Sequence, residues 1–469
     1  MEKTNYNLSQ TFEILGQWTP DYRHFEDAIA GTLHYNPEGI RLEIYGAFAG
    51  ETPLDQLYGF TQNGESIWIS GLVSKQENPK TPGYSVKEYT VRDCFIFEED
   101  LGLFQNERSE VFTKIFKESP AEFRVSALSF TTNHLLEWFG KGLMYGDTAE
   151  VLTVPYGLLE RREFSYNGRS LITELRQEKR VTDQQKIEIT SAPRIVLKND
   201  ARESVFFKAL YHEALNVKKL IELFCEDYDF FDTVNFHLAG EASGISGQYI
   251  PNQRGSRKSS LFSDDYLSFS DLEDTFDEIL ANYSQKSEKL DLVVDTYLNE
   301  FYLNENMETK LLNTIRNLEV YHRNFIEGNL PEHADVALEI EREYINQFID
   351  DHVAADYQVG FRAQVNYAPE KNLRKRLQEL LKTLPDALFE QLGLGKETER
   401  KSRSISSFAY KLGETRNYYT HRDSPAKYPG RLIEWDALAK ANSTLRKIGL
   451  YYIYYELSVD EELILKALK

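Results

Sequence analysis

Residues 240–260 read GEASGISGQYIPNQRGSRKSS, and this stretch divides the chain into two regions that differ in hydrophobic period. It is rich in Gly, Ser and Asn and has no apolar repeat, which is typical of a linker or a long loop. Before it, apolar residues recur at every second position, and after it they recur every three or four positions. We therefore predict an α+β chain with a β-rich domain at residues 1–240, a linker or loop at 241–268 and a helical bundle at 269–469.

The first region contains segments that alternate like half-buried strands. GIRLEIYGAF (residues 39–48) places Ile40, Leu42 and Ile44 at every second position. Similar segments are Glu65–Ser74, Tyr89–Phe97, Glu122–Phe130, Lys186–Leu197 and Phe231–Gly240. Turn residues such as Asn63-Gly64 separate them, and one helix is predicted from about Ser204 to Cys225. Strands at this density, without alternating helices, favour an antiparallel sandwich-like domain.

The second region has the period of helices. SDLE, with Ser270 and Glu273, matches a capping box and is followed by apolar residues at helical spacing up to Tyr283. Further helices are predicted at Leu290–Leu303, Met307–Ile326, Ala334–His352, Asn372–Leu392, Ser402–His421 and Leu432–Leu457. This part of the chain is therefore expected to be all helical.

The composition limits the classes of function. The chain has 469 residues, 41% of them hydrophobic, and a formal net charge of −21. Because an evenly acidic surface repels nucleic acid, contact with RNA or DNA requires a local basic patch. No run of about 20 apolar residues occurs, and the N-terminal MEKTNYNLSQ lacks the layout of a signal peptide. These features predict a soluble, cytoplasmic protein without membrane contact.

Common cofactor and metal motifs are absent from the sequence. Cys94 and Cys225 are the only cysteines, which argues against a disulfide scaffold or a thiolate zinc site. His212-Glu213 lacks the second histidine of a zinc-protease helix. In LGLGKET (residues 392–398), Glu397 stands where a phosphate loop needs a hydroxyl, so a helix end followed by a loop is the better interpretation. We therefore expect no metal and no cofactor.

One constellation near the C-terminus can support catalysis. RNYYTH runs from Arg416 to His421, and Pro425 requires the helix to end before it, so His421 lies in the last turn or just beyond. Five residues separate Arg416 from His421, which is about 140° around a straight helix. The two side chains can therefore meet at one atom only if the helix end is distorted or if two copies of the motif face each other in a dimer.

These residue types suit cleavage of RNA. Histidine can take the proton of a ribose 2′-hydroxyl, whose oxygen then attacks the adjacent phosphate. Arginine can bind the phosphate oxygens and stabilise the transition state, and Asn417 can hold either group by hydrogen bonds. Basic residues nearby are Lys396, Arg400, Lys401, Arg403, Lys411, Arg422, Lys427 and Arg431. They outnumber the acids Glu397, Glu399, Glu414 and Asp423. Tyr418 and Tyr419 could stack on bases, although core packing is the better use of Tyr419.

A second, similar pattern occurs in RNLEVYH, from Arg316 to His322. Here His322 falls on the same helical stripe as Ile315, Leu318 and Phe325, so it is interpreted as a core histidine. His322 or Glu319 could still line the site if the two helices pack together.

From about Leu290 to the C-terminus, the chain resembles a HEPN domain of the ApeA type. The motif of that family is Arg, a polar residue that is often Asn, a few further positions and His, before the last long helix. Arg416, Asn417 and His421 match it residue by residue. NLEVYHRNFIEG (residues 317–328) resembles the early helix of the subfamily, and GQWTP (residues 16–20) with its following strands is similar to the accompanying N-terminal domain. A departure is the single aromatic residue in GQWTP, where relatives often have two.

The resemblance implies a bacterial antiviral protein that acts by abortive infection. A HEPN homodimer would cleave host or phage RNA, with tRNA as one candidate, without a metal. Cleavage would follow recognition of a phage-derived trigger by the N-terminal domain, and the resting enzyme would be inhibited. Arg416, Asn417 and His421 would be its catalytic residues.

Two alternatives stay open. The bundle could be a catalytically silent HEPN module that binds RNA or a protein, with the β-rich half as the recognition module. The N-terminal domain could also bind carbohydrate or protein while the bundle dimerises. The joint presence of Arg, Asn and His favours the enzyme, because a binding module does not need an imidazole.

Overall fold

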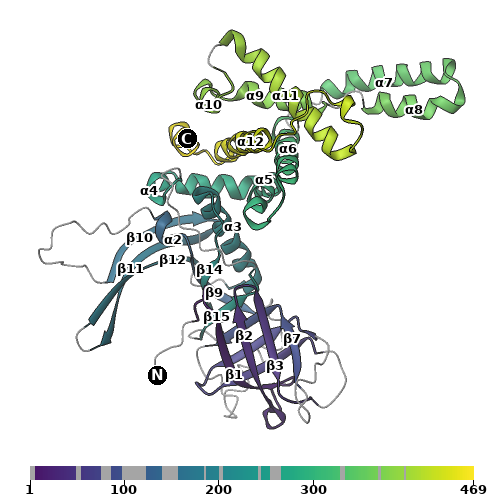
Figure 1. Ribbon diagram of the computed structural model, residues 1–469. Helices are drawn as coiled ribbons and strands as arrows, with labels where there is room; N and C mark the ends of the chain where they lie inside the picture. Colours follow the sequence, from purple (N-terminus) through teal and green to yellow (C-terminus); the bar gives the residue numbers. More distant parts are fainter. Residues whose placement is uncertain are drawn as a thin grey trace, which may run out of the picture. The chain divides into compact units, whose positions relative to one another are not determined.

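The structure is a computed structural model that describes residues 6–48, 54–74, 86–97, 123–139, 157–183, 186–199, 204–240, 245–253, 266–327, 333–367, 371–395 and 398–469. The chain folds into two compact units, Met1–Ala281 and Asn282–Lys469 (Figure 1). The first unit is a large antiparallel β-sheet with a helix, and the chain beyond it is helical, which confirms the predicted fold class.

The described residues of the first unit contain fifteen strands. They are β1 (Phe12–Thr19), β2 (Ile29–Asn36), β3 (Gly39–Ile44), β4 (Gln56–Thr61), β5 (Ser66–Ser70), β6 (Val73–Ser74), β7 (Lys87–Val91), β8 (Asp93–Phe97), β9 (Arg124–Thr132), β10 (Gly157–Tyr166), β11 (Arg169–Asp183), β12 (Lys186–Lys198), β13 (Val205–Phe206), β14 (Phe231–Leu238) and β15 (Ser246–Pro251). Neighbours pair antiparallel in the order β10-β11-β12-β9-β14-β15-β8-β5-β4-β1-β2-β3-β7-β6, with β13 beside β9.

The sheet curls because one stretch of chain pairs with two distant strands. Tyr89 of β7 lies opposite Leu42 of β3, whereas Phe95 of β8 lies opposite Trp68 of β5. The strands between β8 and β7 in the sheet order must therefore bend round until their ends meet near Arg92. The prediction of a single strand at Tyr89–Phe97 was wrong, because the partner changes at Arg92.

Trp18, in the GQWTP segment, is a core residue of this curled sheet. Its side chain is fully buried, and its Nε1 donates a hydrogen bond of 3.1 Å to the carbonyl oxygen of Gly31. A Cβ on Gly59 would lie 2.6 Å from the indole ring. Glycine at position 59 is therefore required for the ring to pack.

Helix α3 (Phe207–Cys225) covers β9 and confirms the predicted helix, except that β13 takes its first residues. Its Phe207 ring packs against Phe95 and Phe236, with centroids 5.1 Å and 5.6 Å away. Two short α-helices, α2 (Leu135–Trp138) and α4 (Phe269–Leu272), and the short 3-10 helix η1 (Phe25–Asp27) also belong to the unit. Cys94 and Cys225 are both buried and unpaired.

A buried charged cluster lies where α3 leads into β14. Lys218 Nζ pairs with Glu222 at 2.6 Å and donates to the carbonyl oxygen of Asp229 at 2.7 Å. The Asp229 carboxylate accepts hydrogen bonds from the backbone N–H groups of His134 and Phe230. Burial raises the pKa of Asp229 to about 6, although Lys218 and His134 oppose this shift.

The remaining helices follow in chain order. They are α5 (Phe276–Tyr302), α6 (Met307–Tyr321), the π-helical turn η3 (His322–Ile326), α7 (His333–His352), α8 (Ala355–Tyr367), α9 (Leu373–Thr383), α10 (Asp386–Gln391), α11 (Thr398–His421), α12 (Trp435–Glu456) and α13 (Glu461–Ala467). Helix α6 packs along α12, where the Tyr321 and Tyr452 rings stack with centroids 4.7 Å apart. None of the helices in the described ranges is long and apolar enough to cross a membrane.

Several boundaries differ from the sequence-based expectation. The predicted helix at 372–392 is two helices, because Pro385 holds Leu384 in an extended conformation. The capping box is formed by Ser268 and Asp271, not by Ser270 and Glu273. Strand β15 lies inside the predicted linker, of which residues 241–244 and 254–265 fall outside the described residues.

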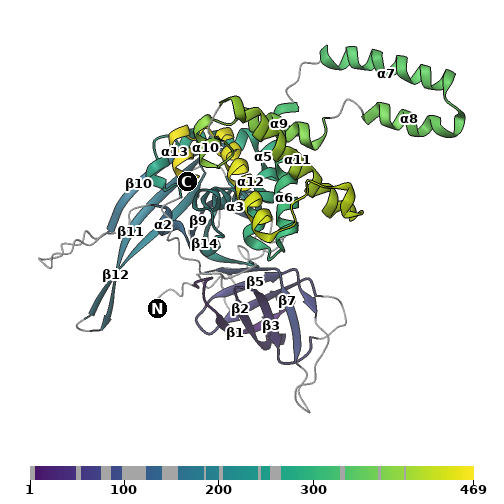
Figure 2. The ribbon, with the colours of Figure 1, turned by 45° about the horizontal axis from the view of Figure 1, so that its top comes forward.

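Helices α7 and α8 pack on each other as a hairpin (Figures 1 and 2). The hairpin exposes large apolar side chains, namely Ile340, Tyr344, Ile345, Phe348, Tyr357, Val359 and Phe361. Polar groups lie in its seam, where Gln358 donates to the carbonyl oxygens of Asp350 and Val353. Helices α8 and α13 were not predicted from the sequence.

Candidate active site at the end of helix α11

Helix α11 buries an apolar stripe whose residues are spaced by three and four. Ile405, Leu412 and Thr415 are at most 2% exposed, and Phe408 is half-buried. This stripe faces the neighbouring helix α9 and part of α6. On a regular helix, Asn417 and His421 lie opposite this stripe, whereas Arg416 lies at its edge.

The structure places Arg416 and Asn417 in direct contact and leaves His421 apart. Arg416 Nη1 donates a hydrogen bond of 3.2 Å to Asn417 Oδ1, and both side chains are half-buried. His421 is exposed in the last turn of α11, and no hydrogen bond or ion pair joins it to Arg416 or Asn417. The helix is α-helical through His421, so the distortion that would let one copy converge is not present.

The residue after the motif ends the helix in a strained conformation. Arg422 has φ of 50°, in the left-handed region that favours glycine, and its N–H donates to the carbonyl oxygen of Tyr418 at 2.8 Å. The chain thus turns away directly after His421, as the position of Pro425 predicted.

The following loop is tied to α11 and keeps a carboxylate near His421. Leu432 N donates to Thr415 Oγ1 at 2.8 Å, and the fully buried Thr415 in turn donates to the carbonyl oxygen of Lys411. A hydrogen bond from Lys427 lowers the pKa of Asp423, and the charge of His421 adds to this effect.

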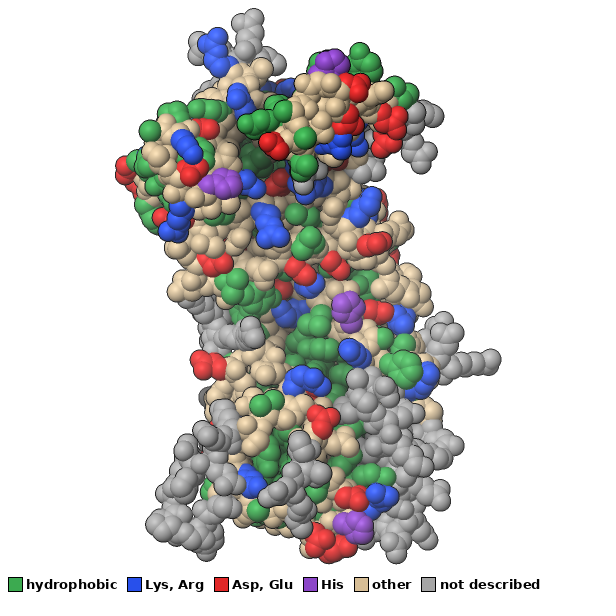
Figure 3. Space-filling view, turned by 90° about the vertical axis from the view of Figure 1, so that its right-hand side faces the viewer, with side chains coloured by type: hydrophobic (Ala, Val, Ile, Leu, Met, Phe, Trp, Pro, Cys, Tyr) green, Lys and Arg blue, Asp and Glu red, His purple; other side chains and the backbone are tan. Residues whose placement is uncertain are grey.

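The basic surroundings are only partly free to bind an anion. Lys401 pairs with Asp386 at 2.6 Å and Lys427 with Asp423 at 3.1 Å, while the Arg431 guanidinium lies over the Tyr418 ring at 4.8 Å. Among the described basic side chains of this region, Arg403, Lys411, Arg416 and Arg422 have no ion-pair partner, and Arg431 donates only to the backbone carbonyl oxygens of Pro425 and Tyr428. Lys396 and Glu397 lie outside the described residues. On the face drawn in Figure 3, basic and acidic side chains are interspersed over the described part.

The second Arg-to-His pattern has a different role. His322 is fully buried, and its Nε2 lies 2.9 Å from Glu379 Oε2, which confirms the interpretation as a core histidine. Burial opposes ionisation of Glu379, but hydrogen bonds from Lys371 and His322 outweigh it and lower the pKa of this carboxyl. His322 also begins the π-helical turn η3.

Arg376 of α9 connects this cluster to α6. Its side chain is 5% exposed, and it pairs with Glu319 at 2.7 Å and with Glu327 at 3.2 Å. Glu319 and His322 therefore bind α9 rather than Arg416 or His421. Arg316 is exposed on α6 and does not join them.

Family models match both parts of the chain. The model described as ApeA N-terminal domain 1 matches residues 13–283, which is more than half of the sequence. The chain belongs to the ApeA family. A second model, described as Apea-like HEPN, matches residues 312–463 and includes Arg416, Asn417 and His421. HEPN is a family associated with RNase activity. No curated protein and no solved structure matches this ApeA-family chain.

One feature of this ApeA-family protein was not found from the sequence. Glu379, the hydrogen-bond partner of His322, lies 57 residues away in the chain. The only local signal was the spacing of three between Arg376 and Glu379, which places both on one face of α9. Within the described residues, no group of three or more His, Cys, Asp or Glu side chains is arranged to hold a metal ion.

Proposed function

We propose that the protein is a metal-independent endoribonuclease that acts in antiphage defence, with its chemical centre at Arg416, Asn417 and His421. The observation that supports this most is the end of α11, where a guanidinium, an amide and an exposed imidazole of the HEPN motif lie within six residues. Membership in the ApeA family supports the defence role and an N-terminal domain that senses infection.

The proposed reaction is an attack by the ribose 2′-oxygen on the adjacent phosphorus. A base removes the 2′-hydroxyl proton, the bond between phosphorus and the 5′-oxygen breaks, and an acid protonates the leaving 5′-oxygen. The products are a 2′,3′-cyclic phosphate and a 5′-hydroxyl. His421 is exposed and can exchange protons, and Arg416, whose fork is held by Asn417, can neutralise the phosphate.

The active unit in this proposal is a dimer. On a regular helix, Arg416 and His421 point about 140° apart and lie about 7.5 Å apart along the axis. They cannot both reach one phosphate from the same copy. A twofold arrangement would place the arginine of one copy opposite the histidine of its partner.

The test compares RNA 5′-hydroxyl ends in cells that express wild-type protein or variants, with and without phage. We expect His421→Ala and Arg416→Ala each to reduce phage-dependent cleavage by about 10²-fold or more. Matched controls are His352→Ala, an exposed histidine at the end of α7, and Arg323→Ala, an exposed arginine in the turn η3. Both controls should cleave like wild type. Purified wild-type protein, supplied with lysate from infected cells, should also cut RNA in EDTA.

Co-expression of the two inactive variants tests the dimer. With equal amounts, half of the dimers contain both variants, and one of their two composite sites is intact, so about a quarter of wild-type cleavage should return. If the mixture stays inactive, the two residues do not act across copies. If infected cells show the same RNA ends with wild type and His421→Ala, the enzyme proposal fails and the silent HEPN module is favoured.

A further inference from the structure

The hairpin of α7 and α8 carries polar side chains in its seam and apolar ones on its surface. Most of the half-buried seam positions are polar, namely Arg342, Asn346, Gln358 and Arg362. Asn346 Oδ1 and Arg362 Nε are buried there and make no hydrogen bond with any described residue. Large apolar side chains of both helices are exposed instead. Because a helix pair in water normally buries its apolar side chains, this arrangement indicates that another surface covers them.

One side of the hairpin gathers apolar side chains from both helices. At about 100° per residue, Ile345 and Phe348 lie on one side of the α7 seam positions. Because α8 runs antiparallel to α7, Tyr357 and Phe361 lie on that same side. These four residues form the hairpin face, and their side chains are 42%, 54%, 65% and 54% exposed. Two antiparallel helices with apolar side chains on one side form a groove that a third helix can fill, as in a helix bundle.

The hairpin is strongly acidic. Residues 333–367 contain seven acidic residues and two arginines, but no lysine. Both arginines already have partners within the hairpin, since Arg342 pairs with Glu339 and Arg362 pairs with Asp350. The positive charges that could offset the remaining carboxylates must therefore come from outside the hairpin.

Two of these carboxylates lie at the edge of the hairpin face. Glu341 is one turn before Ile345 and Asp351 is one turn after Phe348, so each lies on the same stripe of α7 as its apolar neighbour. Both acids are exposed, and neither has an ion-pair partner among the described residues. The apolar stripe of α7 is thus flanked by negative charge at both ends.

The charge decides among the possible occupants of the hairpin face. Nucleic acid and anionic membranes are negatively charged and would be repelled. The same face of a second copy would bring like charges together, which is unfavourable. A helix with an apolar stripe and lysine or arginine along its edges would instead place opposite charges beside the carboxylates of α7.

We propose that the hairpin face binds a basic amphipathic helix of another protein. The apolar stripe of that helix lies between Phe348 and Phe361, and its basic edge lies beside Glu341 and Asp351. The complex is a three-helix bundle in which the exposed apolar side chains of both partners become buried. This interaction does not require nuclease activity at the end of α11.

Binding to the full-length protein is measured by calorimetry with a synthetic helical peptide about four turns long. Leucines recur in this peptide every three or four positions, and lysines fill the remaining positions. At low salt we expect a Kd below about 0.1 mM, and at about 0.5 M salt the Kd should rise about tenfold or more. A peptide with glutamate in place of every lysine should not bind.

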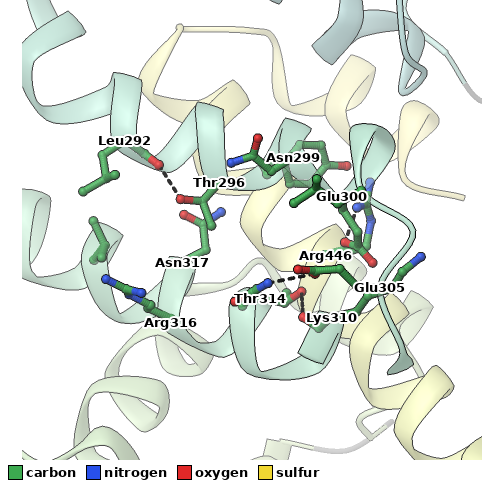
Figure 4. A pocket seen from close by; sticks show the side chains of 14 residues that line it. Leu292, Thr296, Asn299, Glu300, Glu305, Lys310, Thr314, Arg316, Asn317 and Arg446 are labelled. Atoms are coloured by element: carbon green, nitrogen blue, oxygen red, sulfur yellow. Dashed lines mark hydrogen bonds and ion pairs between the residues drawn. The ribbon is translucent and has the colours of Figure 1, made fainter. Parts of the chain in front are cut away.

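Phe348→Ser and Phe361→Ser test the apolar contact from separate helices. Each change removes a phenylalanine that the peptide would bury, so each should weaken binding by about tenfold or more. Leu292→Ser is the matched control, because Leu292 is 58% exposed on α5, outside the hairpin, at the rim of a pocket of about 250 Å³ (Figure 4). The control should bind within about twofold of wild type.

Glu341→Gln combined with Asp351→Asn tests the charge. At low salt this double variant should bind about threefold or more weakly, and at about 0.5 M salt it should bind like wild type, because salt screens the lost attraction. The matched control combines Glu461→Gln with Glu462→Gln, which are exposed acids in the first turn of α13. It should bind like wild type at both salt concentrations.

The proposal is overturned if the basic peptide does not bind at about 1 mM, or if the acidic peptide binds equally well. It is also overturned if Phe348→Ser and Phe361→Ser bind like Leu292→Ser, or if the charge variant binds like its control at low salt. Far-ultraviolet circular dichroism shows whether the serine variants are folded, and the charge variant decides if they are not. Sedimentation of the wild-type protein tests the remaining occupant: self-association that Phe348→Ser removes would assign the hairpin face to a second copy and overturn the proposal.

Discussion

Replacement of Arg376 by Met tests whether the buried cluster holds α6 against α9. Arg376 is the cation between Glu319 and Glu327, and it is 5% exposed, while the two carboxylates are 17% and 22% exposed. Methionine has a similar length and no charge, so the change removes the cation and leaves two carboxylates without their partner. The helices should then separate more readily.

The expected cost follows from the burial of the pair. Removal of one partner of a buried ion pair costs about 3–5 kcal/mol, and the partial exposure of the carboxylates favours the lower end, about 3 kcal/mol. At about 1.4 kcal/mol per tenfold change, this raises the population of the opened state by about 10²-fold. Hydrogen exchange of peptides from α6 and α9 should accelerate by that factor.

Two further variants make the measurement specific. Lys375→Met removes the same charge from an exposed position on α9 and should change exchange by less than about threefold. Adding Glu319→Gln and Glu327→Gln to Arg376→Met should restore more than half of the lost stability, because the orphaned charges are removed. The reasoning is refuted if peptides from α6 and α9 exchange at the same rate in Arg376→Met and Lys375→Met. It is also refuted if the triple variant is no more stable than Arg376→Met alone.

Three other predictions concern single residues. Burial raises the pKa of Asp229 to about 6, above its unfolded value of about 3.9. The contribution of this group to folding stability is therefore fully present below about pH 4 and is lost as the pH rises through 6. The free energy of opening of α3, measured by hydrogen exchange, should therefore rise in Asp229→Asn relative to wild type by on the order of 2–3 kcal/mol between pH 4 and pH 7. A difference between the two proteins that stays the same at both pH values would contradict this. Arg422→Gly should stabilise the end of α11 by about 0.5–1 kcal/mol in the same assay, because φ of 50° suits glycine, and Arg422→Ala, which keeps the strain, should not. Thr415→Val should lower the free energy of unfolding by about 1–3 kcal/mol and speed hydrogen exchange of the Leu432 amide. In Thr415→Ser, which keeps the hydroxyl, the Leu432 amide should still exchange slowly.

Local patterns predicted the elements whose burial follows a regular period. Helix α3 was predicted to within three residues, and the helix that ends at His421 was predicted with its C-terminal end in place. Helix α8 was missed because Tyr357, Val359 and Phe361 are spaced by two and are all exposed. The break at Pro385 was marked by a local signal, since proline disfavours a helical residue before it.

Other errors depended on contacts that no local pattern contains. Residues 89–97 alternate like one strand, but they become two because their partners are β3 and β5. SFSDLE contains two overlapping capping-box patterns. The structure uses the first, Ser268 with Asp271, and Phe269 and Leu272 of this short helix are buried.

The sequence alone determined the division into a β-rich and a helical region, because hydrophobic period depends only on neighbouring residues. It also determined the candidate residues at the end of α11, because their spacing and the following proline are local features. Only the tertiary structure decided that His322 is sealed against Glu379, that the sheet curls at Arg92 and that the hairpin face of α7 and α8 stays exposed. Each of these depends on which distant residue supplies the opposing surface, and hydrogen bonds and burial are satisfied only when that surface is in place.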